Sequence, residues 1–167
     1  MRIILISIYL HIPFCDRKCF YCDFYSIEDK NYIENFVEDI CTEIDLQTQY
    51  LNIKNEYVET VFFGGGTPSL LTEIQLEKII NQLHSNYNMS ANAEWTLESN
   101  PKTFNLDLLK SYRKLGINRL SIGIQSFNDD ELKFLQRTHN STQAIKAINT
   151  ARKAGFDNLN LDIIFSI

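Results

Sequence analysis

Short apolar runs alternate along the chain with longer stretches in which apolar residues recur every three or four positions. The short runs are typical of strands, and the longer stretches are typical of amphipathic helices. Strands are expected at residues 3–12, 57–63, 94–99, 119–125 and 158–167. Helices are expected at residues 29–50, 72–87, 105–115, 129–136 and 142–154. This alternation predicts an α/β fold with parallel strands and right-handed crossovers, built as a barrel or as a doubly wound sheet.

Local signals support the boundaries of two predicted helices. Thr72 and Gln75 have the spacing of a capping box at the start of a helix. Asn105 is placed to cap the next helix, and Gly116 follows that helix where a left-handed residue is expected. The helix boundaries are therefore predicted from capping chemistry as well as from periodicity.

The composition is that of an ordinary globular domain. The 167 residues are 44% hydrophobic and 22% charged, which fits one domain. The net charge of −5 argues against a nucleic-acid-binding surface, because such surfaces need clustered lysine and arginine. The apolar residues 3–8 are too few to span a membrane and run directly into a cysteine-rich loop. We therefore expect a soluble protein without a transmembrane segment, located in the reducing cytoplasm.

Cys15, Cys19 and Cys22 lie on one short loop with the spacing C-x₃-C-x₂-C. Three thiolates can hold three irons of a [4Fe–4S] cluster and leave the fourth iron without a protein ligand. An open position on a metal centre is where chemistry takes place, so the spacing predicts a reactive cluster. Zinc and plain thiols are the alternatives, but neither His11 nor Cys41 completes a familiar zinc pattern.

Polar and glycine clusters follow the predicted strands. The cysteine loop follows the first strand, residues 64–68 (Gly-Gly-Gly-Thr-Pro) follow the second, Glu98 and Asn100 end the third, and Gln125 ends the fourth. Because the carboxyl ends of parallel strands share one rim, we expect an active site there. The sequence stops on its fifth strand, which suggests an unfinished barrel and a truncated or partial gene product.

Six segments together resemble the radical S-adenosylmethionine (SAM) enzymes, and among them the oxygen-independent coproporphyrinogen III oxidase-like family that includes the haem chaperones. The segments are YLHIPFC (9–15), the cysteine loop (15–22), FGGGTPS (63–69), ESNP (98–101), LSIGIQSF (120–127) and NLD (160–162). The resemblance implies a partial (β/α)₆ barrel of the TIM type, with residues 1–167 as a radical SAM core that lacks its C-terminal domain. It also implies that SAM binds the open iron and is cleaved to methionine and a 5′-deoxyadenosyl radical, with an electron-donor protein as partner.

The resemblance also suggests roles for individual residues. Cys15, Cys19 and Cys22 match the iron ligands of the family. The positions that match cofactor contacts are Tyr9, Tyr21, Gly65, Gly66, Thr67, Glu98, Gln125, Arg137 and Asp162. Within this set, the glycine–threonine stretch matches the family segment that receives the amino group of SAM. Glu98 matches a family carboxylate that lies near the ribose or the amine of SAM. Tyr21, Gln125, Arg137 and Asp162 match contacts to a second SAM in the oxidase.

Each of these residues also has a purely structural interpretation. Residues 64–66 are also compatible with a tight strand-to-helix turn, and Glu98 with a solvated acid at a strand end. Tyr9 is equally compatible with core packing, and the remaining polar positions with an ordinary barrel rim. Cys41 is interpreted as a core residue of its helix.

The three histidines give no clear functional signal. His11 is expected to bond a backbone carbonyl rather than a metal. His139 is compatible with a catalytic role or with a helix boundary. His84 is expected to be an exposed helix residue.

One position separates the branches of the family. The oxidase has a further cysteine two positions after the third, and here that position is Phe24. This favours a haem chaperone, with haem as cofactor or cargo; the haem-linked motif of that branch lies in a C-terminal domain outside this chain. The alternatives are a coproporphyrinogen III oxidase acting on a porphyrinogen substrate, and an inactive or binding-only fragment. Whether the chain is an enzyme is left open.

Overall fold

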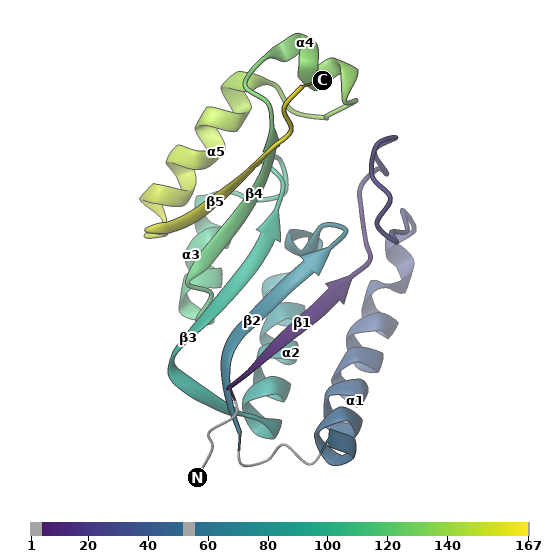
Figure 1. The fold of residues 1–167 in the computed structure, drawn as a ribbon, viewed down its shortest axis with the longest axis vertical. Coiled ribbons are helices and arrows are strands. Elements are labelled where there is room, and N and C mark those ends of the chain that lie inside the picture. The colour runs from purple at the N-terminus through teal and green to yellow at the C-terminus, as the bar shows by residue number, and fades with distance from the viewer. Residues whose placement is uncertain (1–4, 52–55, 167) are drawn as a thin grey trace.

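The fold is a single five-stranded parallel sheet with helices on one side, seen in a computed structural model that describes residues 5–51 and 56–166 (Figure 1). The strands are β1 (Leu5–Ile12), β2 (Tyr57–Gly65), β3 (Asn88–Ser99), β4 (Arg119–Gln125) and β5 (Asn158–Ile163). The helices are α1 (Ile33–Leu51), α2 (Glu73–Asn86), α3 (Leu106–Lys114), α4 (Asp129–Phe134) and α5 (Ser141–Lys153). Short 3₁₀ turns at Lys30–Tyr32 and Pro68–Leu70 precede α1 and α2.

The strand order distinguishes between the two predicted architectures. All neighbouring strands pair in parallel, and their spatial order β1-β2-β3-β4-β5 is their order along the chain. A doubly wound sheet reverses its strand order at a switch point, whereas a barrel keeps it. Helices α1, α2 and α3 lie behind the sheet in Figure 1, and its other face is open. The fold is therefore an arc of a β/α barrel, as expected from the sequence.

The two faces of the sheet differ in chemistry because side chains alternate along each strand. On β1, Leu10 and Ile12 are buried against the helices, and on β4 Ile122 and Ile124 are buried in the same core. Tyr9, the residue before Leu10 on β1, points to the other face of the sheet and is largely exposed there. The apolar runs thus form the core between sheet and helices, and the residues between them face the inside of the arc.

The predicted capping residues are found at the helix ends. Thr72 and Gln75 form a capping box at the start of α2, and the side chain of Asn105 accepts a hydrogen bond from Leu108 N. Gly116 has a φ of 97°, the left-handed conformation expected after α3. A second capping box, between Asn140 and Gln143, was not foreseen, and it starts α5 one residue earlier than expected.

Three strands differ in length from the expectation. Strand β2 runs to Gly65 rather than ending at residue 63. Strand β3 begins at Asn88 rather than at residue 94, and Asn88 pairs with Tyr57 of β2. Its first residues are small and polar, so the hydrophobic pattern did not reveal them. Strand β5 ends at Ile163 rather than at residue 167, and Ile164 N bonds Gln125 O beyond it. Residues 3 and 4 of the first predicted strand, and residue 167, lie outside the described residues.

Candidate functional site

A hollow of about 360 Å³ lies at the carboxyl ends of the strands. Every predicted site residue except Tyr9 lines it, although these residues come from loops and strands spread across the whole chain. The lining residues are Cys15, Arg17, Lys18, Cys19, Tyr21, Cys22, Phe24, Ser26, Gly65, Gly66, Thr67, Glu98, Ser99, Asn100, Gly123, Gln125, Arg137 and Asp162. The rim predicted from the strand ends is thus one continuous site.

The cysteine loop is fixed at its base by backbone hydrogen bonds. Cys15 N bonds Ile27 O at 3.0 Å, and Ile27 N bonds Pro13 O at 2.7 Å. Within the loop, Cys22 N bonds Cys19 O at 3.0 Å. The thiols of the loop are half-buried, and burial raises the pKa of the Cys15 thiol, an effect opposed by the hydrogen bond from Thr67. The loop therefore presents its sulfur atoms toward the hollow from a defined backbone.

The chemistry of the lining fits an iron–sulfur cluster. Among residues 5–51 and 56–166, no three His, Cys, Asp or Glu side chains gather closely enough to hold one metal ion. A [4Fe–4S] cluster does not need such convergence, because its cysteines bind different irons. Ser26 Oγ and Arg137 Nε are buried and have no hydrogen-bond partner in the described part of the chain. Both belong to residues that line the hollow, where a sulfide-rich cluster or an anionic ligand would supply the missing acceptors.

The glycine turn at the end of β2 packs directly against β1 and the cysteine loop. Gly65 has a φ of 110°, and a Cβ there would lie 2.8 Å from the His11 ring. A Cβ on Gly66 would lie 2.5 Å from Phe14 O, one residue before Cys15. Gly66 N also bonds Ile12 O at 2.8 Å. The glycines thus permit a close approach of two backbones in addition to forming a turn.

Glu98 is held at the end of β3 with its carboxylate against this turn. Its Oε2 accepts a hydrogen bond from Gly65 N at 3.0 Å. Burial raises the pKa of Glu98 above its ordinary value; the Gly65 bond opposes this rise, and the nearby Asp162 adds to it. Glu98 is therefore a fixed carboxylate in the hollow rather than a freely solvated acid.

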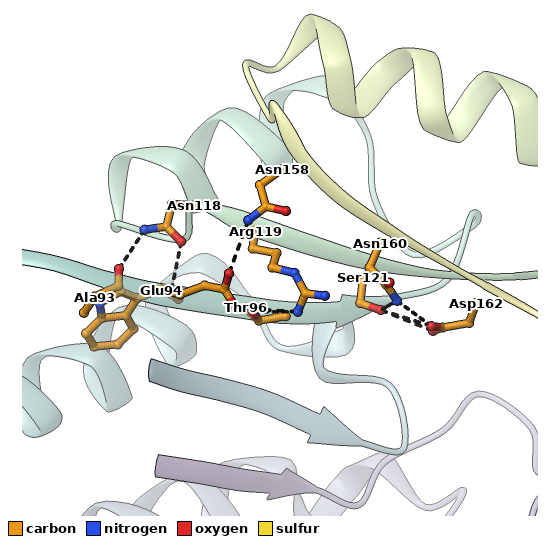
Figure 2. A network of polar contacts seen from close by, with 10 residues as sticks. Ala93, Glu94, Thr96, Asn118, Arg119, Ser121, Asn158, Asn160 and Asp162 are labelled. Carbon is orange, nitrogen blue, oxygen red and sulfur yellow. Dashed lines mark hydrogen bonds and ion pairs between the residues drawn. The ribbon is translucent and has the colours of Figure 1, made fainter. Parts of the chain in front are cut away.

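Asp162 is fixed by a polar network on the open face of the sheet, drawn in Figure 2. Asn160 Nδ2 donates to its Oδ1 at 2.6 Å, and Ser121 Oγ donates to its Oδ2 at 3.2 Å. Farther down the same face, Arg119 pairs with Glu94 at 3.6 Å. Sequence reasoning gave no role to Ser121 or Asn160, although both lie in the motifs quoted above.

Gln125, Arg137 and Tyr21 meet on the remaining side of the hollow. Gln125 ends β4 with a φ of 69°, which is unusual for a residue other than glycine. The Tyr21 hydroxyl accepts a hydrogen bond from Arg137 at 3.3 Å, and burial raises the pKa of Tyr21 to about 12. Tyr21 therefore stays protonated at neutral pH.

Tyr9 lies apart from the hollow, on the open face of β1. Its hydroxyl is 3.1 Å from His11 Nδ1, and His11 Nε2 is 2.9 Å from Tyr25 O. Because a carbonyl oxygen only accepts hydrogen bonds, Nε2 of His11 is the donor to Tyr25 O. Nδ1 then accepts a hydrogen bond from the Tyr9 hydroxyl. His11 thus bonds a backbone carbonyl, as expected. Tyr9 is exposed rather than packed in the core.

The other titratable side chains of interest lie outside the hollow. His84 is exposed on α2, as expected, and stacks on Trp95. Cys41 is buried in the core, also as expected. His139 lies in the segment that joins α4 to α5 and is buried. Its Nε2 donates to Ile124 O at 3.0 Å, so the side chain has a structural partner, which supports the helix-boundary interpretation.

We expect His139 to make folding sensitive to mild acid. Burial lowers the pKa of His139, so the folded state disfavours the charged form. Its contribution to stability is present above the ordinary histidine pKa of about 6.5 and is lost as the pH falls below it. The melting temperature of His139→Gln should therefore fall less between pH 7 and pH 5.5 than that of the wild type.

The control for this prediction is His84→Gln, which removes a histidine from an exposed position. It should keep the wild-type dependence of melting temperature on pH. Identical pH profiles for His139→Gln and the wild type would contradict the prediction.

A second hollow, of about 580 Å³, lies at the opposite ends of the strands. Tyr57, Tyr87, Trp95 and Asn118 are among its lining residues. It is larger than the hollow at the cysteines, but none of the described residues that line it carries a thiol or a carboxylate. Size alone therefore does not locate the chemistry of this fold, because in β/α barrels the reacting groups lie at the carboxyl ends.

Comparison with known proteins agrees with this geometry. The Radical SAM superfamily profile matches residues 9–167. The solved structure of the coproporphyrinogen III oxidase HemN from Escherichia coli, a radical SAM enzyme, superposes with a TM-score of 0.87 and 31% sequence identity. The match covers 96% of this chain and 37% of that chain. The chain therefore belongs to the radical SAM superfamily.

Within the superfamily, the chain is similar to curated proteins named heme chaperone HemW. It is 41% identical to the protein from Buchnera aphidicola subsp. Schizaphis graminum, over 97% of this chain and 43% of the relative. It is 36% identical to the protein from Escherichia coli, with the same two coverages. The chain thus spans less than half the length of these relatives.

Membership of the superfamily implies a [4Fe–4S] cluster and SAM as cofactors, as expected from the cysteine loop. It also implies a source of electrons for the cluster. None of the helices in the described residues has the length and apolar character needed to span a bilayer.

Proposed function

We propose that this chain is a SAM-binding iron–sulfur protein whose site is the hollow at the carboxyl ends of the strands. Cys15, Cys19 and Cys22 would hold the cluster, and the glycine turn and Glu98 would bind the amino end or ribose of SAM. When bound, the reduced cluster and SAM supply a one-electron reductive cleavage of SAM. The observation that carries the proposal is the meeting of the three thiols, the glycine turn and the Glu98 carboxylate in one hollow.

The chain's own residues prepare this site for a charged ligand. The Gly65 N–H holds the Glu98 carboxylate in place, so this acceptor needs little reorganisation when a cationic amine binds. The carboxylate of Asp162 is likewise fixed, by Ser121 and Asn160. We propose Gln125, Asp162, Tyr21 and Arg137 as further ligand contacts in the same hollow. Tyr9, which lies outside the hollow, would contact only a ligand that extends over the open face of β1.

Glu98→Gln should weaken SAM binding while stabilising the fold. Burial raises the pKa of Glu98, so keeping this side chain charged lowers the stability of the folded state at neutral pH. This loss of stability disappears below the ordinary carboxyl pKa of about 4.3, where the side chain is protonated in both the folded and the unfolded state. The variant should therefore melt at a higher temperature than the wild type at pH 7, with the difference lost near pH 4. A lost charge-assisted hydrogen bond should lower SAM affinity by about tenfold or more, measured by anaerobic calorimetry on cluster-loaded protein.

The matched control for Glu98→Gln is Glu94→Gln, on the same strand but in the Arg119 pair below the site. It should keep wild-type SAM affinity. Equal SAM affinity in the wild type and Glu98→Gln would contradict the proposed role of this carboxylate.

We further propose a haem-chaperone role, in which haem is bound and handed on, rather than porphyrinogen oxidation. The similarity to proteins named heme chaperone HemW supports it. So does Phe24, whose largely exposed ring lines the hollow where the oxidase pattern would have a fourth cysteine. The structural match to the oxidase HemN makes coproporphyrinogen oxidation the second candidate. We place the protein in the cytoplasm, where a reduced cluster is most easily kept.

An anaerobic assay separates the two candidates. Cluster-loaded protein is mixed with SAM, a reductant and coproporphyrinogen III, and in parallel is titrated with haem. The chaperone role predicts saturable haem binding, with no vinyl-containing porphyrin product. Formation of that product would favour the oxidase instead.

A further inference from the structure

The guanidinium of Arg137 lies at the centre of the site and reaches a cysteine sulfur. Its Nη1 donates to Cys19 Sγ at 3.6 Å and to the Tyr21 hydroxyl at 3.3 Å. Its Nη2 donates to Gly123 O at 2.9 Å and to the Asn100 side-chain oxygen. The carbonyl of Gly123, fixed by the β4 backbone, and the Asn100 side chain thus orient the arginine toward the cysteine loop.

The same hydrogen-bond network continues to a second cysteine. Asn100 Nδ2 donates to Thr67 Oγ1 at 3.0 Å, and the Thr67 hydroxyl donates to Cys15 Sγ at 3.7 Å. Thr67 is buried and Asn100 directly follows β3, so both donors lie at the carboxyl end of the sheet. One connected set of donors therefore reaches two of the three sulfur atoms of the loop.

Such donors act on the redox properties of a cluster. Hydrogen bonds to the ligating sulfurs and nearby charge are two of the factors that set the reduction potential of an iron–sulfur cluster. Reduction adds one negative charge to the cluster, and a fixed cation with an N–H aimed at a thiolate stabilises that charge. The network thus favours the reduced state, which is the state that transfers an electron to SAM.

We propose that Arg137, oriented by Asn100 and Gly123, is a positioning residue that raises the reduction potential of the cluster through Cys19 and, by way of Thr67, through Cys15. This rests on the proposed function, because it requires a cluster on the three cysteines. It assigns Arg137 a role on the cluster in addition to any contact with SAM.

Arg17 provides a matched control, because it carries the same charge and lines the same hollow. Its Nη2 donates to Gln136 O at 3.0 Å and to Gln136 Oε1 at 3.2 Å, and it has no hydrogen bond to a sulfur among those found in the described residues. Removing Arg17 therefore changes the local charge without removing a donor to a thiolate.

The test is the midpoint potential of the reconstituted cluster without SAM, measured by dithionite titration of wild type, Arg137→Gln and Arg17→Gln. Arg137→Gln should shift the midpoint potential to a more negative value by about 59 mV. For a one-electron couple this shift equals a tenfold change in the ratio of reduced to oxidised cluster. Arg17→Gln should shift it by less than half as much. Equal shifts in the two variants, or no shift in Arg137→Gln, would overturn the proposal.

A second variant covers the case in which Arg137→Gln fails to hold a cluster. Thr67→Val keeps the side-chain shape and removes the hydroxyl that donates to Cys15 and accepts from Asn100, with the arginine left in place. It should give a smaller negative shift, and a wild-type potential in this variant would then overturn the proposal. A wild-type chain that takes up no cluster would instead refute the proposed function itself, and the inference with it.

Discussion

Anaerobic reconstitution of Cys19→Ala is expected to leave the protein with almost no bound iron, whereas the wild type takes up about four irons per chain. The reason is that three thiolates are the minimum that the open cluster uses, and the loop supplies no replacement near Cys19. Iron and sulfide analysis, together with the visible absorption band of the cluster, measures the effect. Cys15→Ala and Cys22→Ala should behave in the same way.

The matched control is Cys41→Ala, which removes the one cysteine outside the loop. Cys41 is buried in the core on α1, so its loss should destabilise the fold slightly but leave the iron content unchanged. Wild-type iron content in Cys19→Ala would show that the three cysteines are not the ligands.

The second large effect is expected for Gly66→Ala, which should both destabilise the protein and prevent cluster assembly. A Cβ at this position would lie 2.5 Å from Phe14 O, so the backbone just before Cys15 must move. Overpacking of this kind costs about 1–3 kcal/mol, and the rigid backbone partner places Gly66→Ala at the upper end. Urea unfolding measures the stability, and iron content after reconstitution measures the assembly.

Gly116→Ala separates the two consequences. Gly116 has a positive φ, which Gly66 does not, but a Cβ added at Gly116 would meet nothing within 4 Å, and the residue is remote from the hollow. This variant should lose about 1–2 kcal/mol from backbone strain alone and still bind the cluster fully. If Gly66→Ala assembled as much cluster as Gly116→Ala, the glycine turn would have no special relation to the cysteine loop.

The parallel β/α arrangement was predictable because each strand and helix carries its own local signal. The choice of a barrel over a doubly wound sheet came from the family resemblance. Apolar runs marked the strands, capping residues such as Thr72 and Asn105 marked helix starts, and alternation implied parallel pairing. The rim followed from topology, since parallel strands end on the same side. The beginning of β3 was missed because its mostly small and polar residues give no strand pattern, and the pairing of Asn88 and Met89 with β2 is not visible in a local sequence signal.

The candidate site could be predicted as a set of residues but not as a set of contacts. Eleven of the twelve residues lie in the quoted motifs, Arg137 was assigned through the family resemblance, and the structure brings all except Tyr9 into one hollow. Their roles as ligands stay predictions. The hydrogen bonds of Arg137 to Cys19 and of Arg17 to Gln136 span more than a hundred residues, so only the folded chain discloses them.

Two features of the lining had no usable sequence signal. Ser26 lies outside every motif, yet its buried hydroxyl lacks a partner in the described chain and borders the cysteines. The fit of Gly66 against Phe14 depends on the register between β1 and β2. Both are products of packing between segments that are distant in sequence.

The measurement that tests the central claim most directly is the electron paramagnetic resonance spectrum of the reduced, reconstituted protein before and after addition of SAM. If the cluster on Cys15, Cys19 and Cys22 has an open iron in the SAM-binding hollow, SAM will change the cluster signal in the wild type and in Cys41→Ala. At a SAM concentration near the wild-type dissociation constant, the same addition should change the signal far less in Glu98→Gln. A wild-type cluster signal that saturating SAM leaves unaltered would contradict the assignment of this hollow as a SAM site.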